Sequence, residues 1–278
     1  MKLASHEQKL AFVFLAFAIA ASLGGWFWQQ SAVIPVLIGM LGILIAIQLK
    51  QINLVHYLRA EVEKEALLNY RELEALISLY KTVPVRKPLP AMRGWAASPD
   101  FCCLLASTIN EHHPRVIVET GSGVSTLISA YCFQQFKGGH IYSLDHEEEY
   151  AENTRHQIAL HQLEEFATVF HSPLQKTDLE NGNWQYYDLS CLSAIGSIDM
   201  LVVDGPPNSL QPLSRYPLLP LLAGKLSPNV VILMDDTIRP DEKRIATLWA
   251  KAFDLSLQEF PLEKGAILLR RQARSAVS

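Results

Sequence analysis

The most informative segment of this chain reads Val116-Ile117-Val118-Glu119-Thr120-Gly121-Ser122-Gly123-Val124-Ser125-Thr126. An apolar strand ends in the acid Glu119, a Gly-x-Gly turn follows, and a helix begins after the turn. Glycines let the backbone turn tightly and let a ligand approach closely. In open α/β sheets, ligands bind at the carboxyl ends of such strands. The segment therefore predicts a strand, a ligand-binding turn and a helix of an α/β domain.

Short β-rich runs alternate with helical stretches from about Pro99 onward. Strands are expected at 115–119, 140–145, 167–171, 200–204, 230–235, 255–260 and 266–270. Helices are expected at 125–136, 147–163, 210–222 and 241–253. This alternation predicts a mostly parallel sheet with helices on both faces. Residues 261–265 are too few for a crossover, so the last two strands should form an antiparallel hairpin.

Further acids end the predicted strands after the glycine turn. Asp145 ends the second strand, 24 residues after Gly121, which is close to the roughly 20 typical of a ribose-binding acid. A carboxylate can accept hydrogen bonds from two hydroxyls. Asp204 follows the fourth strand, and Asp235 and Asp236 end the fifth. Helix capping is the alternative role for Asp145, Asp204 and Asp236.

The glycine turn and Asp145 together resemble the first motifs of class I S-adenosylmethionine (SAM)-dependent methyltransferases. A dinucleotide-binding fingerprint would require Gly or Ala at position 126, where this chain has Thr126. The resemblance covers roughly Arg93 to Arg270 and implies a Rossmann-like sheet. It also includes the family-like stretches Arg93-Gly94-Trp95 and Arg215-Tyr216-Pro217, and Arg239, Glu242 and Trp249.

The resemblance implies where SAM would bind. The residues expected to contact it are Glu119, Gly121, Ser122, Gly123, Ser125, Asp145, Ser172, Leu174 and Asp204. In this family the acid at the position of Glu119 lies near the methionine end of SAM, and the segment from Ser172 to Leu174 lies near the adenine. His146 is expected to be a surface residue of the following helix. Arg93, Trp95 and Arg215 are expected either to form an acceptor pocket or to brace the linker.

The resemblance to catechol-type enzymes suggests O-methylation, with a metal near the ends of the fourth and fifth strands. A hydroxyl acceptor needs a positioned base, and Asp204 is the candidate catalytic residue because Pro207 and Asn208 stand where such enzymes often carry a lysine. Asp204, Asp235 and Asp236 offer the oxygen ligands that a hard cation such as Mg²⁺ prefers. The sequence therefore predicts a Mg²⁺ site at these three carboxylates.

The N-terminal part contains no Asp, Glu, Lys or Arg from Leu10 to Leu49. It divides into the apolar runs 10–28 and 32–49, each close to the roughly 20 residues that cross a bilayer. Trp26 and Trp28 end the first run, where aromatic rings favour the membrane interface. Residues 1–50 are therefore expected to form a transmembrane helical hairpin. A cleaved signal peptide and a buried helical hairpin of a soluble protein are the alternatives.

Basic residues flank this hairpin on both sides, namely Lys2, Lys9, Lys50 and Arg59. The positive-inside rule then predicts a two-pass inner-membrane protein whose catalytic domain is cytoplasmic. Residues 51–92 are expected to contain an amphipathic helix over 51–81 and a linker with three prolines. The helix could be a stalk, the seam of a homodimer or a face packed on the catalytic domain of residues 93–278.

The composition excludes some classes of protein. The net charge is −4, so no basic excess indicates nucleic-acid binding. The four cysteines form no CxxC pair, which favours a reducing compartment over a zinc site or disulfides. The expected partner is instead an unidentified methyl acceptor, which could be a small molecule, a glycan or a lipid-linked compound. A nicotinamide-dependent oxidoreductase and a non-catalytic membrane scaffold remain as alternative functions.

Overall fold

The computed structural model describes residues 13–22, 24, 33–180 and 182–271, and the chain divides into two units between Leu68 and Asn69. The first unit contains an apolar helix at Val13–Ser22 and most of helix α2 (Val33–Thr82). Two separate segments were expected on either side of Lys50, but α2 is continuous. The reason is local, because residues 47–53 contain neither Gly nor Pro to interrupt the helix.

Among the described residues, α2 is the one helix long and apolar enough to cross a membrane. The qualifying segment, Ile34–Thr82, has a window with a mean hydropathy of 1.8, and none of that window is buried. The interpretation of α2 as a membrane-spanning helix rests on its length and composition. The expected turn at 29–31, Trp26 and Trp28 lie outside the described residues. The transmembrane hairpin therefore stays a prediction.

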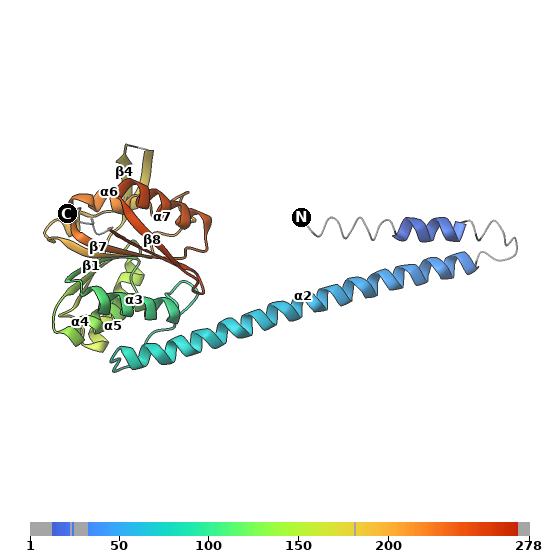
Figure 1. Ribbon diagram of the computed structural model, residues 1–278, viewed down its shortest axis with the longest axis horizontal. Helices are drawn as coiled ribbons and strands as arrows, with labels where there is room; N and C mark the ends of the chain where they lie inside the picture. Colours follow the sequence, from blue (N-terminus) through green and yellow to red (C-terminus); the bar gives the residue numbers. More distant parts are fainter. Residues whose placement is uncertain (1–12, 23, 25–32, 181, 272–278) are drawn as a thin grey trace, which may run out of the picture. The chain divides into compact units, whose positions relative to one another are not determined.

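The second unit is an α/β domain, whose elements are seen in Figure 1. Its helices are α3 (Pro99–His112), α4 (Val124–Phe136), α5 (Glu148–His161), α6 (Leu218–Leu222) and α7 (Pro240–Phe253), with short 3₁₀ turns η1 (Ser190–Leu192) and η2 (Ala223–Lys225). Its strands are β1 (Val116–Thr120), β2 (His140–Asp145), β3 (Ala167–His171), β4 (Leu174–Leu179), β5 (Gly182–Tyr187), β6 (Ile198–Val203), β7 (Leu226–Asp235), β8 (Leu255–Phe260) and β9 (Ala266–Arg271).

Seven strands form the main sheet in the order β3-β2-β1-β6-β7-β9-β8. The first five are parallel, whereas β9 pairs antiparallel with both β7 and β8. This confirms the Rossmann-like sheet and its antiparallel C-terminal hairpin. The register places Thr120 beside both Leu144 and Val203, so β1, β2 and β6 end at the same edge.

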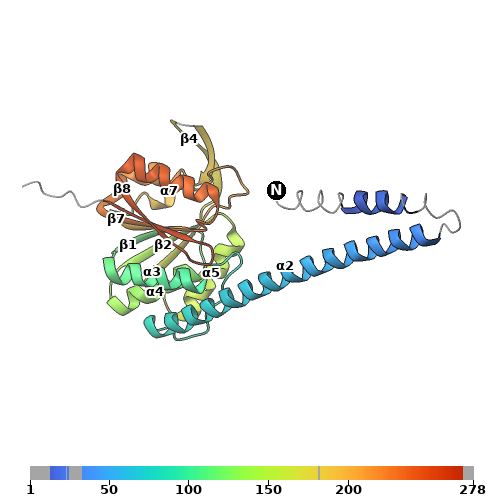
Figure 2. The same cartoon turned by 45° about the vertical axis from the view of Figure 1, so that its right-hand side comes forward.

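Buried side chains fill both faces of the sheet, because alternate residues of each strand point to opposite sides. Helices α3, α4 and α5 cover one face, and α6 and α7 cover the other, as Figure 1 shows; Figure 2 shows the same placement of α3, α4, α5 and α7. In β1, Ile117 packs in the first core and Val118 in the second. Leu79 and Val83, at the end of α2 and the start of the linker, are also buried in the first core. The linker therefore packs on the domain.

Within the second unit, the sequence prediction differs from the structure in three places. The helix expected at 210–222 forms only at Leu218–Leu222, because Pro212 and Pro217 interrupt the pattern. Helix α3 was missed, although Ser98-Pro99-Asp100 is a helix start with Pro at its first position. The hairpin of β4 and β5 was missed because its alternating side chains are mostly polar or exposed.

Candidate active site

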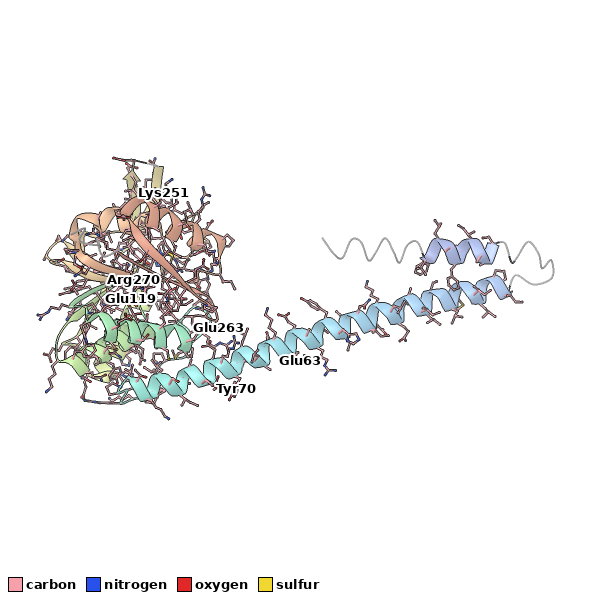
Figure 3. The ribbon with its side chains drawn as sticks, viewed as in Figure 1. Glu63, Tyr70, Glu119, Lys251, Glu263 and Arg270 are labelled. Atoms are coloured by element: carbon pink, nitrogen blue, oxygen red, sulfur yellow. The ribbon has the colours of Figure 1, made fainter. Side chains whose placement is uncertain are left out.

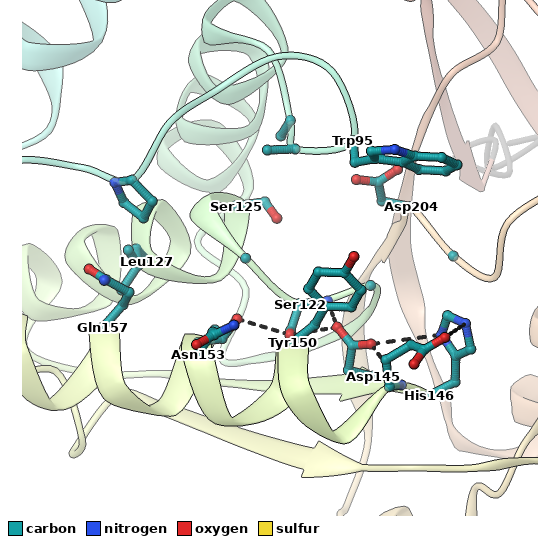
Figure 4. A pocket seen from close by; sticks show the side chains of 18 of the residues that line it. Trp95, Ser122, Ser125, Leu127, Asp145, His146, Tyr150, Asn153, Gln157 and Asp204 are labelled. Carbon is teal, nitrogen blue, oxygen red and sulfur yellow. Dashed lines mark hydrogen bonds and ion pairs between the residues drawn. The ribbon is translucent and has the colours of Figure 1, made fainter.

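A cavity of about 530 Å³ opens at the carboxyl ends of β1, β2 and β6 (Figure 4). Its size is within the roughly 300–1,000 Å³ typical of small-molecule sites. The wall is formed by Pro90, Trp95, Ala96, Ala97, Gly121, Ser122, Gly123, Ser125, Leu127, Asp145, His146, Glu147, Tyr150, Asn153, Thr154, Gln157, Tyr187, Asp204, Gly205 and Pro207. The structure thus brings together six of the predicted SAM contacts, namely Gly121, Ser122, Gly123, Ser125, Asp145 and Asp204.

The glycine turn packs directly against the exit of β6. Gly121 has a φ of +88°, and a Cβ there would lie 3.1 Å from the carbonyl oxygen of Asp204. The turn is fixed by hydrogen bonds from Gly121 N to the carbonyl oxygen of Leu144 and from Asp204 N to that of Thr120, both at 2.9 Å. A side chain at position 121 would therefore strain the backbone and push β1 and β6 apart.

Glu119 lies inside the sheet, immediately before the turn (Figure 3), and its side chain is fully buried. Its Oε2 accepts hydrogen bonds from the hydroxyls of Thr126 at 2.5 Å and Ser143 at 2.7 Å. Its Oε1 has no partner among the described residues. Burial raises the pKa of Glu119 to about 7, although the hydroxyl bonds oppose that rise. Glu119 does not line the cavity, so its contact with SAM stays a prediction, and the Oε1 atom without a partner is the feature that favours it.

Asp145 is held by the same turn. Its Oδ2 accepts hydrogen bonds from Ser122 N at 3.0 Å and Ser122 Oγ at 2.7 Å, and its Oδ1 accepts one from Glu147 N at 3.2 Å. A carboxylate has about four acceptor positions, so one remains for a ligand. The Ser122 hydroxyl also lies 3.0 Å from Thr154 Oγ1, which offers it another partner. If the Ser122 hydroxyl donates to Thr154 Oγ1 instead, the Asp145 carboxylate can accept hydrogen bonds from both hydroxyls of a diol.

Asp204 follows β6 and reaches the cavity wall, with 13% of its side chain exposed. Burial raises its pKa to about 7, the nearby Arg215 guanidinium lowers it, and the negative charge of Asp236 raises it. A carboxyl group that titrates near neutral pH can take up or release a proton under ordinary conditions. The predicted role of Asp204 as the catalytic base is compatible with this position and stays a prediction.

The predicted Mg²⁺ site does not fit the structure. The Asp236 carboxylate is 2.6 Å from Arg215 Nη2 and 2.9 Å from Arg239 Nη1, so two guanidinium groups occupy its surroundings. Burial, reinforced by the charge of Asp204, raises the pKa of Asp235 well above its usual range. No metal-binding group of three such side chains occurs within the described part of the chain. The structure therefore does not support the predicted metal site at Asp204, Asp235 and Asp236.

Ser172 and Leu174 lie away from the wall that the described residues form. The Ser172 hydroxyl donates to the carbonyl oxygen of Asp188, while Leu174 begins β4 and packs against the second core. Their role with SAM stays a prediction without support from the cavity. His146 was expected on the surface, but it lines the cavity with its ring 5.9 Å from that of Tyr187, edge to face.

Several residues of the wall were missed by the sequence interpretation. Tyr150, Asn153, Thr154 and Gln157 point into the cavity from α5, as Figure 4 shows for the three that it labels. Their spacing of three and four residues is that of one helix face, which is a signal that the sequence already contained. Tyr187 could not be found in the same way, because it belongs to the hairpin that was missed.

Arg93 braces the entry segment. It contacts Glu263 in the turn before β9, with an Nη2–Oε1 distance of 2.6 Å, and donates to Asn69 Oδ1 at 2.6 Å (Figure 3 labels Glu263). Trp95, two residues later, is on the cavity wall and 84% exposed. Of the two roles expected for these residues, Arg93 therefore has that of bracing the linker, whereas Trp95 lies at the cavity as an acceptor pocket would require.

Comparisons with known proteins agree with this fold. Residues 118–237 match a family model described as a methyltransferase domain. The SAH-bound methyltransferase PaMTH1 of Podospora anserina has a TM-score of 0.52 at 16% identity, covering 77% of this chain and 97% of that chain. An O-methyltransferase from Bacillus cereus in complex with SAH has a TM-score of 0.52 at 19% identity, covering 74% and 97%. No curated protein matches this chain.

The parallel sheet with its C-terminal hairpin, the glycine turn and the family match define a methyltransferase domain. The second unit has the fold of class I SAM-dependent methyltransferases, and its residues 118–237 match the methyltransferase-domain model. Thr126, which departs from the dinucleotide fingerprint, has a role of its own here, because its hydroxyl connects Gly123 N with Glu119. The family match favours a methyltransferase over the nicotinamide-dependent oxidoreductase, while the scaffold interpretation stays an alternative that only an activity measurement separates.

Proposed function

We propose that this chain binds SAM in the cavity and transfers its methyl group to a hydroxyl of an acceptor at the cytoplasmic face of the inner membrane. One observation carries the proposal: a single cavity contains the glycine turn, the acid Asp145 and the candidate base Asp204. The first two are features expected of a nucleoside site. The third is a proton acceptor for the hydroxyl.

Each polar group has a separate task in this proposal. When bound, SAM supplies an electrophilic methyl group on a sulfonium sulfur. Asp145 accepts hydrogen bonds from ribose hydroxyls, and Oε1 of Glu119 attracts the ammonium of the methionine end. Asp204 takes the proton of the acceptor hydroxyl. The protein otherwise acts by aligning the two reactants and excluding water, which can contribute about 7–11 kcal/mol to lowering the barrier.

The aromatic part of the wall supports an acceptor with a ring or an apolar segment. Trp95 and Tyr150 line the same cavity as Asp204, with exposed fractions of 84% and 58%. Aromatic side chains with one accessible face bind such groups well. The acceptor is thus a small molecule, a glycan or a lipid-linked compound that presents its hydroxyl beside an apolar portion.

The N-terminal unit supports the location. Residues 10–49 carry no charged side chain, and the described apolar helix residues there are mostly exposed. Exposed apolar residues also recur farther along α2, including Val55, Leu58, Val62 and Tyr70. In the proposed arrangement the first stretch anchors the chain in the membrane, and the second is a surface on which two copies could associate.

Calorimetry with SAM and with its demethylated product tests the cofactor. Wild-type protein should bind both, and Asp145→Ala should bind about tenfold or more weakly, because hydrogen bonds to a charged acceptor are lost. Asp178→Ala is a matched control, since Asp178 is an exposed acid on β4 outside the cavity. Binding of a nicotinamide dinucleotide in place of SAM would overturn the proposal.

Labelling and fractionation test the acceptor and the location. Membranes incubated with methyl-labelled SAM should place label in a lipid, glycan or small-molecule fraction, and Asp204→Asn should remove it. The full chain should sediment with membranes and resist carbonate extraction, whereas a chain beginning at Gln51 should not. A reporter fused at Ser278 should behave as cytoplasmic, and a periplasmic signal would contradict the proposed orientation.

A further inference from the structure

Arg215 lies inside the protein at the exits of β6 and β7, with 2% of its side chain exposed. Its Nη1 donates to the carbonyl oxygen of Asp235 at 3.0 Å and to that of Val203 at 3.4 Å. Its Nη2 donates to the carbonyl oxygen of Asp204 at 3.3 Å. One guanidinium group therefore connects the main chains of two neighbouring parallel strands at the edge that carries the site.

The same guanidinium is surrounded by an acid cluster, which consists of Asp204, Asp235, Asp236 and Glu242. Nη2 is 2.6 Å from Asp236 Oδ2 and 3.4 Å from Asp204 Oδ1, and Nε is 3.9 Å from Glu242 Oε1. Arg239 contacts Asp236 and Glu242 from a more exposed position. Buried carboxylates are costly unless they are paired, and a guanidinium stays protonated in proteins. The acid cluster therefore has a permanent counter-charge within the chain.

Carboxylate and main-chain carbonyl oxygens are also the ligands that a hard divalent cation would use. In this protein the side chain of Arg215 already makes those contacts. We propose that Arg215 is the resident cation of the site: it holds the acid cluster together in place of a metal ion and positions the carboxylate of Asp204. Arg215 is thus a positioning residue that acts through Asp204, and this assignment rests on the proposed function.

Removal of the guanidinium should turn the acid cluster into a metal site. Mn²⁺ alone, followed by electron paramagnetic resonance with the full chain in detergent, is the probe. Arg215→Ala should bind one Mn²⁺ per chain in the acid cluster, with an affinity about tenfold or more above any binding by the wild-type protein. The gain should disappear in Arg215→Ala with Asp236→Asn. Arg215→Lys should again exclude Mn²⁺, because it restores the positive charge.

A folded Arg215→Ala protein that binds Mn²⁺ no better than wild type would overturn the proposal, as would a gain that survives Asp236→Asn. If the alanine variant does not fold, Arg215→Met and Arg215→Lys decide. The proposal is supported if Arg215→Lys folds and Arg215→Met does not, or if Arg215→Met folds and binds Mn²⁺ more tightly than wild type. It is contradicted if Arg215→Lys does not fold, or if Arg215→Met folds and binds Mn²⁺ no more tightly than wild type. Wild-type protein that binds no SAM would instead refute the proposed function and leave the Mn²⁺ result unaffected.

Discussion

The carboxyl edge of the sheet has two sides that hold their acids in different ways. At the exits of β1 and β2, Glu119 and Asp145 are held by hydroxyls and main-chain N–H groups. At the exits of β6 and β7, Asp204 and Asp236 are held by the guanidinium of Arg215. Neutral donors leave the negative charge of a carboxylate available to a ligand, whereas a guanidinium neutralises it. The first side is suited to binding a cationic nucleoside, and the second to placing a base.

The largest expected effect separates these two sides. Asp204→Asn should lower methyl transfer by about 10²–10⁴-fold, because the amide cannot accept the acceptor's proton. The SAM affinity measured by calorimetry should stay within about twofold of wild type, since the contacts of Asp145 and Glu119 are unchanged. Asp178→Asn, at an exposed position on β4, is the control. A variant that loses SAM binding and transfer together would show that the two sides do not act separately.

Gly121→Val should break the first side. The φ of +88° and the contact of a Cβ with the Asp204 carbonyl make any side chain strained there. We expect SAM affinity to fall at least about 100-fold and the free energy of unfolding to drop by about 1–3 kcal/mol. Calorimetry and thermal unfolding measure the two effects. Gly196→Ala is the control, because a Cβ at that position would meet no atom within 4 Å and the φ of Gly196 is not in the left-handed region. If Gly121→Val bound SAM with wild-type affinity, the inference that SAM lies close to the backbone of Gly121 would be refuted.

The two sides also differ in how far the sequence alone could predict them. The glycine side is local in sequence, since Glu119 to Thr126 contains the strand, turn and helix start, and Asp145 ends the next strand. The other side depends on distant residues: Arg215 is buried against Asp236 and Glu242 only because the segment after β6 folds back across β7. Without that contact, three acids at two strand ends are indistinguishable from a metal site.

The fold follows the same division between local and tertiary signals. The sheet strands, which are apolar and flanked by turns, were predicted within a few residues. Hairpin β4–β5 was missed because burial of Tyr186 and Tyr187 comes from tertiary contacts and not from a continuous apolar pattern. Tyr187 matters for the site, since it lines the cavity beside His146. Residues placed by tertiary packing were therefore the ones that the sequence interpretation lost.

The charge of Glu119 can be used to examine the first side by pH. Burial raises its pKa to about 7, so the ionised form that attracts the SAM ammonium is lost as pH falls below 7. SAM affinity should therefore weaken as the pH falls from 7.5 to about 6, and Glu119→Gln should bind SAM weakly without this pH dependence.

The same carboxyl group affects stability when no ligand is bound, because Glu119 holds its proton more tightly in the folded state than in the unfolded state. Stability should thus decrease as pH rises from about 4.5 to 7, and the Gln variant should lack this decrease. Calorimetry and unfolding at several pH values test both.

The smallest expected effect concerns the hydroxyl that shares Asp145 with the ligand. Ser122 Oγ lies 2.7 Å from Asp145 Oδ2 and 3.0 Å from Thr154 Oγ1, so it can give up the carboxylate when the ribose arrives. Thr154→Val keeps the shape but removes this second partner, and the serine then competes with the ribose hydroxyls. One hydrogen bond of about 0.5–1 kcal/mol corresponds to an affinity about two- to fivefold weaker. Thr168→Val on β3, whose hydroxyl contacts His140 away from the cavity, should leave the affinity unchanged. Equal affinities in both valine variants would mean that Asp145 binds the ribose without displacing Ser122.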